Sequence, residues 1–300
     1  MSARLSQREE LEGNDEEELM EITFWGVRGS IASPGPDTIG VGGNTSCVEV
    51  RCGSTKIILD AGTGIRALGD KLLREGSVEA SLLLSHVHWD HIQGIPFFVP
   101  AYVPSSNIQV IGSANGVMSL RDALAYQMTA PVFPVRLDQL GAKIDWREVR
   151  SGERFQINDV VVRVARQNHP GGSFAYRLEW NGRSVVYATD TEHFACIDPE
   201  LYALSRGADV LIYDSQYTPD EYRGTAPGNS KVGWGHSTYV AGVELAKAAG
   251  VGQYVLFHHD PRRTDAGVAD LEERTRELFP SAVAAREGMV IGLDSIARAA

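Results

Sequence analysis

This chain of 300 residues has few of the features that mark secreted, membrane-spanning or nucleic-acid-binding proteins. Its three cysteines, Cys47, Cys52 and Cys196, form neither a CxxC pair nor an even disulfide framework, so we expect reduced thiols in a cytoplasmic protein. The longest mostly apolar stretch, residues 95–103, is too short to cross a bilayer and contains two prolines. No Lys/Arg cluster occurs, which makes nucleic acid an unlikely partner.

The formal charge of −11 is concentrated at the start of the chain. Residues 1–21 hold eight acidic and two basic side chains, and this composition is typical of a disordered tail. Residues 22–300 contain no repeat and no low-complexity linker, and they are long enough to bury a sizeable core. We therefore expect one folded domain over residues 22–300.

Short apolar runs rich in β-branched residues recur along this domain and predict strands. They lie at residues 21–27, 46–52, 55–62, 80–85, 107–112, 159–166, 174–180, 183–189, 209–215 and 253–259. Helical stretches lie between them at residues 64–76, 116–128, 236–250 and 268–279. Asn181-Gly182 predicts a tight hairpin, and Ser237 or Thr238 suits the N-cap of the third helix. This pattern indicates one α/β domain of two packed sheets with helices outside.

Three of the eight histidines and an aspartate fall within six residues, in the stretch SHVHWDHIQG at residues 85–94. Alternate residues of extended backbone share a face, so His86 and His88 project together from the end of a buried strand. Asp90 and His91 follow as the chain turns, and they point in another direction. Nitrogen and oxygen ligands in two directions predict two adjacent metal ions, with zinc, manganese or iron as candidates. The alternative is a turn of surface histidines without metal.

HxHxDH after an apolar strand resembles the signature of the metallo-β-lactamase superfamily, and further stretches match in that superfamily's order. They are GGNTSCVEV, LDAGTGIRAL, NHPGG, ATDTEH and LFHHDP. The resemblance covers nearly all of the chain after the tail. It implies the αββα sandwich, in which two packed mixed sheets carry helices on their outer faces. The chain is most similar to the phosphodiesterase branch, which includes ribonuclease Z, cyclic-nucleotide phosphodiesterases and the cyclic phosphodiesterase of phosphonate utilisation.

The resemblance implies seven ligands for two divalent metal ions, with zinc the first choice and manganese or iron the alternatives. One metal would be held by His86, His88 and His169 and the second by Asp90, His91 and His258, with Asp190 bridging both. His258 is preferred over His259 because it directly follows its strand. Asp60 is expected to orient a ligand rather than to bind metal. From the residues alone, His169 would serve equally well as an ordinary loop histidine.

Further residues are expected to take part in the reaction. The stretch GWGHSTYVAGVELAKAAG resembles the part of ribonuclease Z whose histidine assists phosphodiester cleavage, and this implies His236 as a catalytic acid supported by Asp214. Without that role, His236 would be a helix N-terminal residue and Asp214 a strand-end turn residue. Asp90 is expected to be catalytic as well as a metal ligand. Candidate substrate contacts are Asn44, Thr45 and His193.

The resemblance implies hydrolysis by attack of a metal-bridging hydroxide on phosphorus, with protonation of the departing oxygen by His236. Ribonuclease Z carries a glycine- and proline-rich arm that grips transfer RNA, but here the interval between His169 and Asp190 holds a tight hairpin. We therefore expect a small phosphodiester substrate, a cyclic nucleotide or cyclic ribose phosphate, and no membrane partner. Residues 121–150 would either cover the pocket with Tyr, Met and Phe side chains or form a peripheral subdomain or dimer contact. A homodimer is expected by analogy.

Several other activities stay open at this point. An RNA-processing endonuclease of ribonuclease Z type is one alternative, and a lactam hydrolase, a thioester hydrolase or a flavin-linked oxidoreductase on the same fold is another. A non-catalytic binding protein belongs to a different class. Such proteins usually lose metal ligands, whereas all seven positions are filled here.

Overall fold

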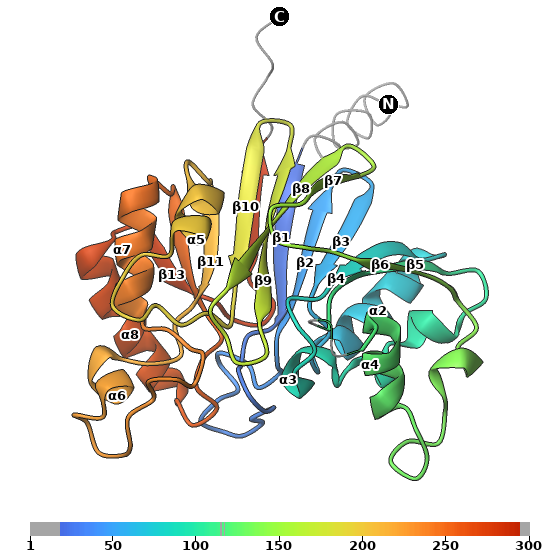
Figure 1. Ribbon diagram of the computed structural model, residues 1–300, viewed down its shortest axis with the longest axis horizontal. Coiled ribbons are helices and arrows are strands. Elements are labelled where there is room, and N and C mark those ends of the chain that lie inside the picture. Colours follow the sequence, from blue (N-terminus) through green and yellow to red (C-terminus); the bar gives the residue numbers. More distant parts are fainter. Residues whose placement is uncertain (1–18, 115, 117, 295–300) are drawn as a thin grey trace, which may run out of the picture.

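The computed structural model describes residues 19–114, 116 and 118–294. Two seven-stranded sheets pack face to face, and helices cover the outer face of each. Figure 1 shows the strands in the middle of the molecule, with α5, α7 and α8 on one side and α2 and α4 on the other. This arrangement confirms the expected αββα sandwich.

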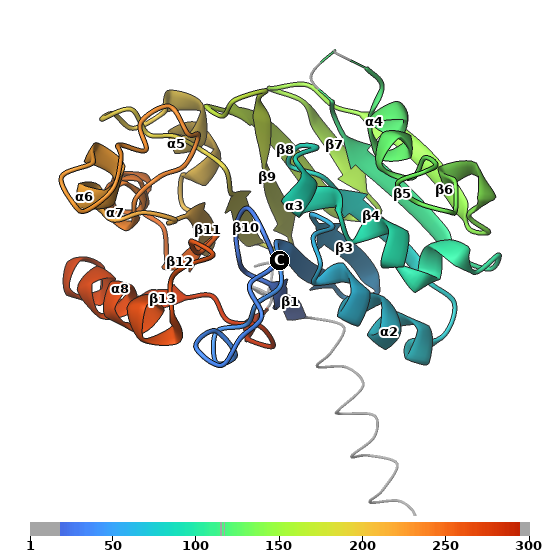
Figure 2. The ribbon, with the colours of Figure 1, turned by 90° about the horizontal axis from the view of Figure 1, so that it is seen from below.

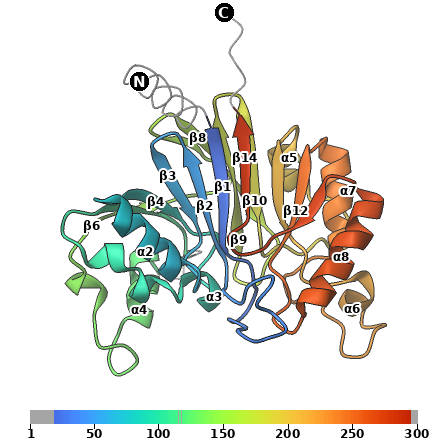
Figure 3. The ribbon, with the colours of Figure 1, turned by 180° about the vertical axis from the view of Figure 1, so that it is seen from behind.

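The first sheet has the strand order β14-β1-β2-β3-β4-β5-β6. Its strands are β1 (Leu19–Gly26), β2 (Cys47–Cys52), β3 (Thr55–Leu59), β4 (Glu79–Leu83), β5 (Asn107–Gly112), β6 (Lys143–Glu148) and β14 (Val290–Asp294). The pairs from β14 to β3 are antiparallel and those from β3 to β6 are parallel. Figure 3 shows β14 beside β1, so the two ends of the described chain share a sheet edge.

The second sheet has the strand order β13-β12-β11-β10-β9-β8-β7. Its strands are β7 (Arg154–Ile157), β8 (Val160–Gln167), β9 (Ser173–Trp180), β10 (Arg183–Ala188), β11 (Val210–Asp214), β12 (Gln253–Phe257) and β13 (Ala282–Ala284). Strands β7 to β10 pair antiparallel, whereas β10 to β13 pair parallel. The carboxyl ends of β8, β10, β11 and β12 therefore lie at one end of this sheet.

The α-helices mostly pack against the outer faces of the sheets, although α3 follows β4 at one end of the sandwich. They are α2 (Ile65–Glu75), α3 (Trp89–Ile92), α4 (Leu120–Gln127), α5 (Pro199–Ser205), α6 (Pro219–Arg223), α7 (Tyr239–Ala249) and α8 (Asp265–Leu278). Three short 3₁₀ helices occur at Ile95–Phe97, Val99–Tyr102 and Leu137–Gln139. Thr238 caps α7, since its Oγ1 accepts a hydrogen bond from the Ala241 N–H at 3.2 Å. Of the two caps that the sequence allowed, the structure uses Thr238.

The larger core lies between the two sheets. The inner faces of both sheets contribute fully buried side chains, among them Phe24, Val50, Tyr187 and Phe257. A second core lies under α2 and α4 on the outer face of the first sheet, and includes Ile65 and Leu124. Because each sheet is buried on both faces over most of its strands, most strands read as continuous apolar runs instead of alternating ones.

The expected elements occur, and further ones appear at the edges. The hairpin at Asn181-Gly182 joins β9 to β10, and φ values of 47° and 77° at these two residues give the primed turn that the sequence predicted. Strand β1 begins at Leu19, three residues before the expected start of the domain. Residues 1–18 of the expected tail lie outside the described residues. The sequence patterns did not predict the edge strands β6, β7, β13 and β14 or the short helices α3, α5 and α6.

A buried arginine anchors the loop that follows β1. The side chain of Arg28 is fully buried, and its Nε donates to the Gly42 carbonyl at 2.8 Å. Its guanidinium also donates to the carbonyls of Asp260 and Arg263, in the segment after β12. This one side chain therefore holds the loop of residues 29–43 against the second half of the chain. Within the described residues, no helix is long and apolar enough to span a membrane.

Candidate metal centre

The seven expected ligands gather at one end of the sandwich. His86 and His88 follow β4, and Asp90 and His91 lie on α3. His169, Asp190 and His258 follow β8, β10 and β12, the strands whose carboxyl ends meet at this end of the second sheet. Figure 2 views the molecule from this end and shows α3 between the two halves. The site is therefore assembled from loops of both sheets.

One group of ligand atoms comes from three histidines. His86, His88 and His169 each offer a ring nitrogen, and these atoms lie within 4.8 Å of one another. His169 Nε2 lies 3.0 Å from His88 Nδ1. The Nε2 of His86 is buried and has no hydrogen-bond partner among the described residues. Three nitrogens that face a common point in this way have the donor set and spacing of a metal site.

The second group is buried and contains two carboxylates. Asp90, His91, Asp190 and His258 present ligand atoms within 4.8 Å of one another. His91 Nε2 lies 3.2 Å from an oxygen of Asp90 and 3.1 Å from one of Asp190, yet it has no partner with hydrogen-bond geometry. His258 Nε2 lies 3.3 Å and 3.2 Å from the same two oxygens. These atoms converge on a point between them, as expected for ligands of one cation.

Asp190 lies between the two groups. Its Oδ2 faces His91 and His258, while its Oδ1 lies 4.0 Å from His86 Nε2 and 3.9 Å from His169 Nε2. The geometry suits a carboxylate that offers one oxygen to each of two neighbouring cations. His259 lies outside both groups, because its Nε2 is 2.9 Å from the Ala285 carbonyl. The structure therefore places His258, and not its neighbour, among the candidate ligands.

Hydrogen bonds at the far nitrogen fix the direction of three histidine rings. His91 Nδ1 lies 2.8 Å from Asp60 Oδ2, and His169 Nδ1 lies 2.8 Å from the Gly235 carbonyl. His258 Nδ1 lies 3.0 Å from Gln216 Oε1. Each acceptor favours a proton on Nδ1, which leaves the Nε2 lone pair directed into the site. Asp60 thus occupies the orienting position that the resemblance implied, whereas the sequence analysis did not identify Gln216.

The charges within the cluster favour ionised carboxylates. Burial alone would raise the pKa of Asp90 and Asp190, but the neighbouring histidines hold both pKa values well below the usual range. Burial alone would lower the pKa of His91, but the charges of Asp190 and Asp90 raise it well above its usual value. Burial, together with the charge of His91, lowers the pKa of His86 well below its usual value. Divalent cations bind anionic oxygens and neutral ring nitrogens, so the donor set present fits two such ions. Binding of an ion would displace the proton that the neighbouring carboxylates favour on His91.

Three residues of the site have left-handed backbone. Asp60, Asp190 and His258 follow β3, β10 and β12, and their φ values are 60°, 55° and 61°. This conformation turns the chain sharply at the end of a strand, and it is adopted more readily by Asp and His than by most other residues. The turn directs each side chain across the open end of the sandwich instead of along the sheet. Backbone of this kind is concentrated at functional sites.

His236 contacts one histidine of each ligand group, and its Nδ1 lies 2.8 Å from Asp214 Oδ2. Its ring stacks on that of His258 at 5.0 Å between centroids and meets the His169 ring edge-on at 5.4 Å. Burial alone would lower the pKa of His236, but the charge of Asp214 and its hydrogen bond raise that pKa to about 9. Asp214 also accepts from the backbone N–H groups of Asp190 and Ser237, which fixes its position.

Glu192 is a buried carboxylate that the sequence analysis did not single out. It accepts hydrogen bonds from the Tyr222 hydroxyl at 2.6 Å and from the N–H groups of Gly233 and Gly235 at 2.7 Å and 2.8 Å. Gly235 in turn accepts from His169 Nδ1 through its carbonyl. A Cβ at position 235 would lie 2.3 Å from that nitrogen, so only glycine allows this approach. Glu192 therefore holds the loop that orients His169.

The candidate substrate residues lie apart from the ligand cluster. The amide of Asn44 donates to Glu287 at 2.9 Å, and Thr45 is fully buried, where it exchanges hydrogen bonds with Thr63. His193 is half-buried, with its Nδ1 3.1 Å from the Ser237 hydroxyl and its ring 4.5 Å from that of Tyr222. The structure brings none of the three into either ligand group, so their substrate role stays a prediction.

An apolar pocket of about 250 Å³ opens directly beside the first group of histidines. His86 and His88 form one wall, and Met118, Ala123 and Gly172 contribute to the others. In the segment 121–150, Tyr126 is 79% exposed and Met128 is buried in the second core, while Phe133 packs edge-on against Phe97. The segment contributes Ala123 to the pocket, and its end forms the edge strand β6, so it is mainly a peripheral part of the first sheet.

Residues 55–259 match the beta-lactamase superfamily domain. Ribonuclease Z of Mycobacterium sp. (strain KMS) is 27% identical over 282 residues, which cover 87% of this chain and 92% of that protein. Ribonuclease Z of Lacticaseibacillus casei (strain BL23) is 37% identical over 249 residues, which cover 67% of this chain and 74% of that protein.

Solved structures share the fold at lower identity. The metallo-beta-lactamase fold protein YhfI from Bacillus subtilis has a TM-score of 0.68 at 19% identity, over 92% of this chain and 100% of that one. A diphosphatase from the PhnP family has a TM-score of 0.67 at 18% identity, over 92% of this chain and 98% of that one. The chain therefore belongs to the beta-lactamase superfamily, and its sequence relatives lie in the branch that includes ribonuclease Z.

Proposed function

We propose that the chain hydrolyses a small phosphodiester, a cyclic nucleotide or a cyclic ribose phosphate, with two divalent metal ions. The observation that carries this proposal is the pair of His236 and Asp214 above both ligand groups. Hydrolysis of a phosphodiester needs a proton donor for the departing alkoxide, and a buried imidazolium beside a carboxylate is such a donor near neutral pH. The relatives named ribonuclease Z agree with this class of bond.

We assign the metal ions to the seven residues that converge at the end of the sandwich. His86, His88 and His169 would hold one ion, Asp90, His91 and His258 the other, and Asp190 both. The set of nitrogen and oxygen donors without thiolate suits zinc first, with manganese and iron as alternatives. Two such ions, when bound, supply a water nucleophile at neutral pH and offset negative charge on a phosphoryl oxygen.

Protonation of the departing oxygen would be carried out by side chains of this chain. Asp214 accepts from His236 Nδ1, so the proton to be donated resides on Nε2, and the charge of Asp214 stabilises the imidazolium before transfer. His236 would give this proton to the departing oxygen. Because burial and stacking on His258 hold its ring in place, little reorganisation accompanies the transfer.

The size of the substrate follows from the surroundings of the site. The interval between His169 and Asp190 is filled by β9, a two-residue turn and β10, which leaves no space for an RNA-gripping arm there. The apolar pocket beside His86 and His88 would hold an uncharged part of a small substrate, such as a base. A ribonuclease Z activity is the second candidate, and the names of the relatives favour it.

The test is turnover of bis-p-nitrophenyl phosphate, 2′,3′- and 3′,5′-cyclic nucleotides and a precursor transfer RNA, with metal content determined on the same sample. We expect two metal equivalents and cyclic-nucleotide turnover well above that of the generic diester. His236→Ala should keep both metals and lose about 10²–10⁴-fold in kcat, the usual contribution of a general acid. Transfer-RNA cleavage above all small diesters would favour the second candidate. A fully metallated protein inert on every diester would redirect the search to lactams and thioesters.

The homodimer expected by analogy stays a proposal of its own. Within the described residues, Trp89, Phe97 and Tyr126 are 65%, 57% and 79% exposed, and all three lie on the half of the chain that carries α3 and α4. Exposed aromatic side chains of this kind are enriched at protein–protein contacts. Light scattering of the purified protein would give the mass directly, and a monomer at all concentrations would contradict the proposal.

A further inference from the structure

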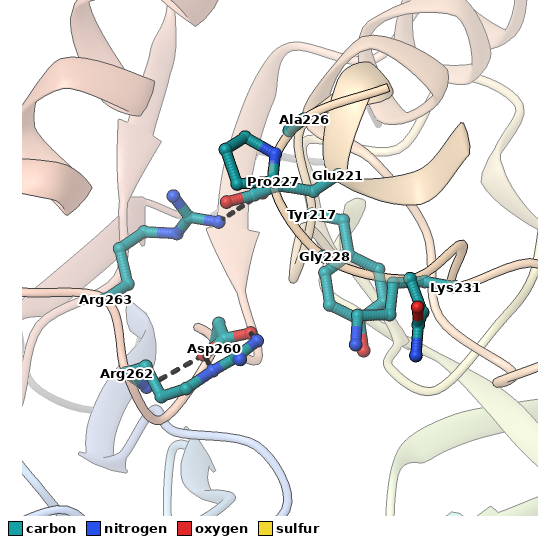
Figure 4. A pocket seen from close by; sticks show the side chains of 10 residues that line it. Tyr217, Glu221, Ala226, Pro227, Gly228, Lys231, Asp260, Arg262 and Arg263 are labelled. Atoms are coloured by element: carbon teal, nitrogen blue, oxygen red, sulfur yellow. Dashed lines mark hydrogen bonds and ion pairs between the residues drawn. The ribbon is translucent and has the colours of Figure 1, made fainter. Parts of the chain in front are cut away.

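A second pocket adjoins the candidate metal centre on the side of His236. Its volume is about 270 Å³, and it lies between the loop 226–231 and the segment 260–263 that follows β12 (Figure 4). Arg262 and Arg263 border it on one side and Lys231 on the other. Neither the seven ligands nor the proposed reaction uses these residues.

Two side chains place this pocket next to the site. Tyr217 lines the pocket, and its ring lies 6.0 Å from the ring of His236. Asp260 also lines it and is two residues beyond His258. The pocket is thus separated from the proposed proton donor by a single side chain. A substituent on the leaving group of a bound substrate would point toward it.

The pocket has an excess of positive charge. Asp260 accepts from Arg262 at 2.9 Å and 3.1 Å, and Glu221 accepts from Arg263 at 2.7 Å, so these four charges balance. Within the described part of the chain, the Lys231 ammonium pairs with no carboxylate and instead lies 4.0 Å from the Trp234 ring. One positive charge therefore remains, in a chain whose formal charge is −11.

A donor close to this charge is unpaired, but its burial keeps it out of reach of a ligand in the pocket. Arg263 Nε is buried and has no hydrogen-bond partner among the described residues, although the Nη2 of the same side chain is bonded to Glu221 and to the Gln216 carbonyl. The ammonium group of Lys231 can donate hydrogen bonds but cannot accept them. A group with several acceptor oxygens and negative charge matches a pocket of this composition.

We propose that this pocket binds a second anionic group of the substrate, such as a terminal phosphate, while the scissile phosphodiester lies at the metal centre. The inference rests on the proposed function and specifies its substrate class. An uncharged part of the substrate occupies the apolar pocket beside His86 and His88, and the leaving group extends past Tyr217 toward Lys231. The two pockets thus differ in polarity, and this difference fixes the orientation of the substrate.

The first experiment compares substrates that differ by one phosphate group, with the metal-loaded full chain. The pairs are ApA with pApA, and adenosine 2′,3′-cyclic phosphate with its 5′-phosphorylated form. We expect kcat/KM to be about tenfold higher for a phosphorylated member, which is the effect of one charge-assisted contact of ordinary strength. Lys231→Met should remove most of this preference and Lys231→Arg should retain it. Lys143→Met, a change of the same kind on the edge strand β6, is the matched control and should retain it as well.

The second experiment measures binding of adenosine 5′-monophosphate and adenosine to the same proteins by calorimetry. Tighter binding of the monophosphate that depends on Lys231 supports the pocket without any turnover. Equal kcat/KM for both members of each pair, or a preference unchanged in Lys231→Met, overturns the inference, while turnover of bis-p-nitrophenyl phosphate would leave the proposed function standing. If no diester is hydrolysed, the proposed function fails, and the binding experiment alone decides on the pocket.

Discussion

Glu192→Gln tests how the loop before His236 is positioned. The carboxylate of Glu192 is 1% exposed and accepts three hydrogen bonds, of which Oε1 takes those from Tyr222 and Gly233 and Oε2 takes that from Gly235. Glutamine has the same shape but one acceptor oxygen. In its better orientation the amide keeps the two bonds at Oε1 and points its NH₂ group at the N–H of Gly235. A donor then faces a donor inside the protein.

The size of the effect follows from that lost contact. A hydrogen bond to a charged group is worth about 1.5–3 kcal/mol, and a buried donor without a partner costs about 1–3 kcal/mol. Since the two terms overlap, we expect Glu192→Gln to lower the free energy of unfolding by about 2–4 kcal/mol. The Gly235 carbonyl, which orients His169 at 2.8 Å, should move with its own N–H. Loss of an orienting partner typically weakens metal binding about 10–100-fold, and here this should affect one of two metal ions.

Chelator competition and urea unfolding of the same samples are the assays. Wild-type protein should release its metals in one range of chelator concentration, and Glu192→Gln should release one equivalent much earlier. Tyr222→Phe is the control, because it removes one bond at Oε1 and leaves both glycine N–H groups paired. Tyr222→Phe should lower the free energy of unfolding by about 0.5–1.5 kcal/mol and keep both metals bound. If Glu192→Gln folds, binds both metals with wild-type affinity and keeps its turnover, the reasoning is refuted.

Three further predictions follow from other contacts. Since His236 would act in its protonated form, turnover should fall as the pH rises through its pKa of about 9. Asp214→Asn removes the charge that raises this pKa, so the fall in turnover should occur at lower pH. Coincident pH–rate profiles of the wild type and the variant would contradict this prediction. Asp60→Ala removes the hydrogen-bond acceptor that lies 2.8 Å from His91 Nδ1. In chelator competition, one metal ion should then bind about 10–100-fold more weakly than in the wild type. Unchanged metal affinity would show that Asp60 does not orient His91. Arg28→Met leaves the Gly42 and Arg263 carbonyls without their hydrogen-bond donor. The free energy of unfolding, measured by urea denaturation, should therefore fall by about 2–4 kcal/mol. A decrease of less than about 1 kcal/mol would contradict the anchoring role of Arg28.

The sequence predicted most of the sandwich because most of its strands are buried on both faces. Such strands read as apolar runs, and ten of them were identified in the sequence at nearly the positions that the structure has. The sequence pattern did not predict the edge strand β6 (Lys143–Glu148), because four of its six residues are charged and none of them is fully buried. The helix α3 (Trp89–Ile92) has a single turn, which is too short for helical periodicity to show.

The prediction of the site depended on sequence proximity and on the resemblance. His86, His88, Asp90 and His91 were recognised from their density alone, whereas His169 and Asp190 needed the family. Neither the local density of ligand residues nor the family resemblance predicted the residues that act through backbone contacts. Glu192 acts on Gly233 and Gly235, which lie over 40 residues further along the chain, and no local pattern indicates such a contact. Gln216 likewise meets His258 only in the folded protein.

The origin of the candidate ligands links metal binding to folding. Four of the seven come from loops of the first sheet and three from loops of the second, so each ion that binds Asp190 together with His86 or His91 joins the two layers. His91 and His258 are far apart in the chain, and in the unfolded chain an ion would have to close a very long loop to bind both. A bound ion then acts as a removable cross-link between the halves of the sandwich. The melting temperature should therefore rise with free metal concentration and fall with chelator, and it can report occupancy without any substrate.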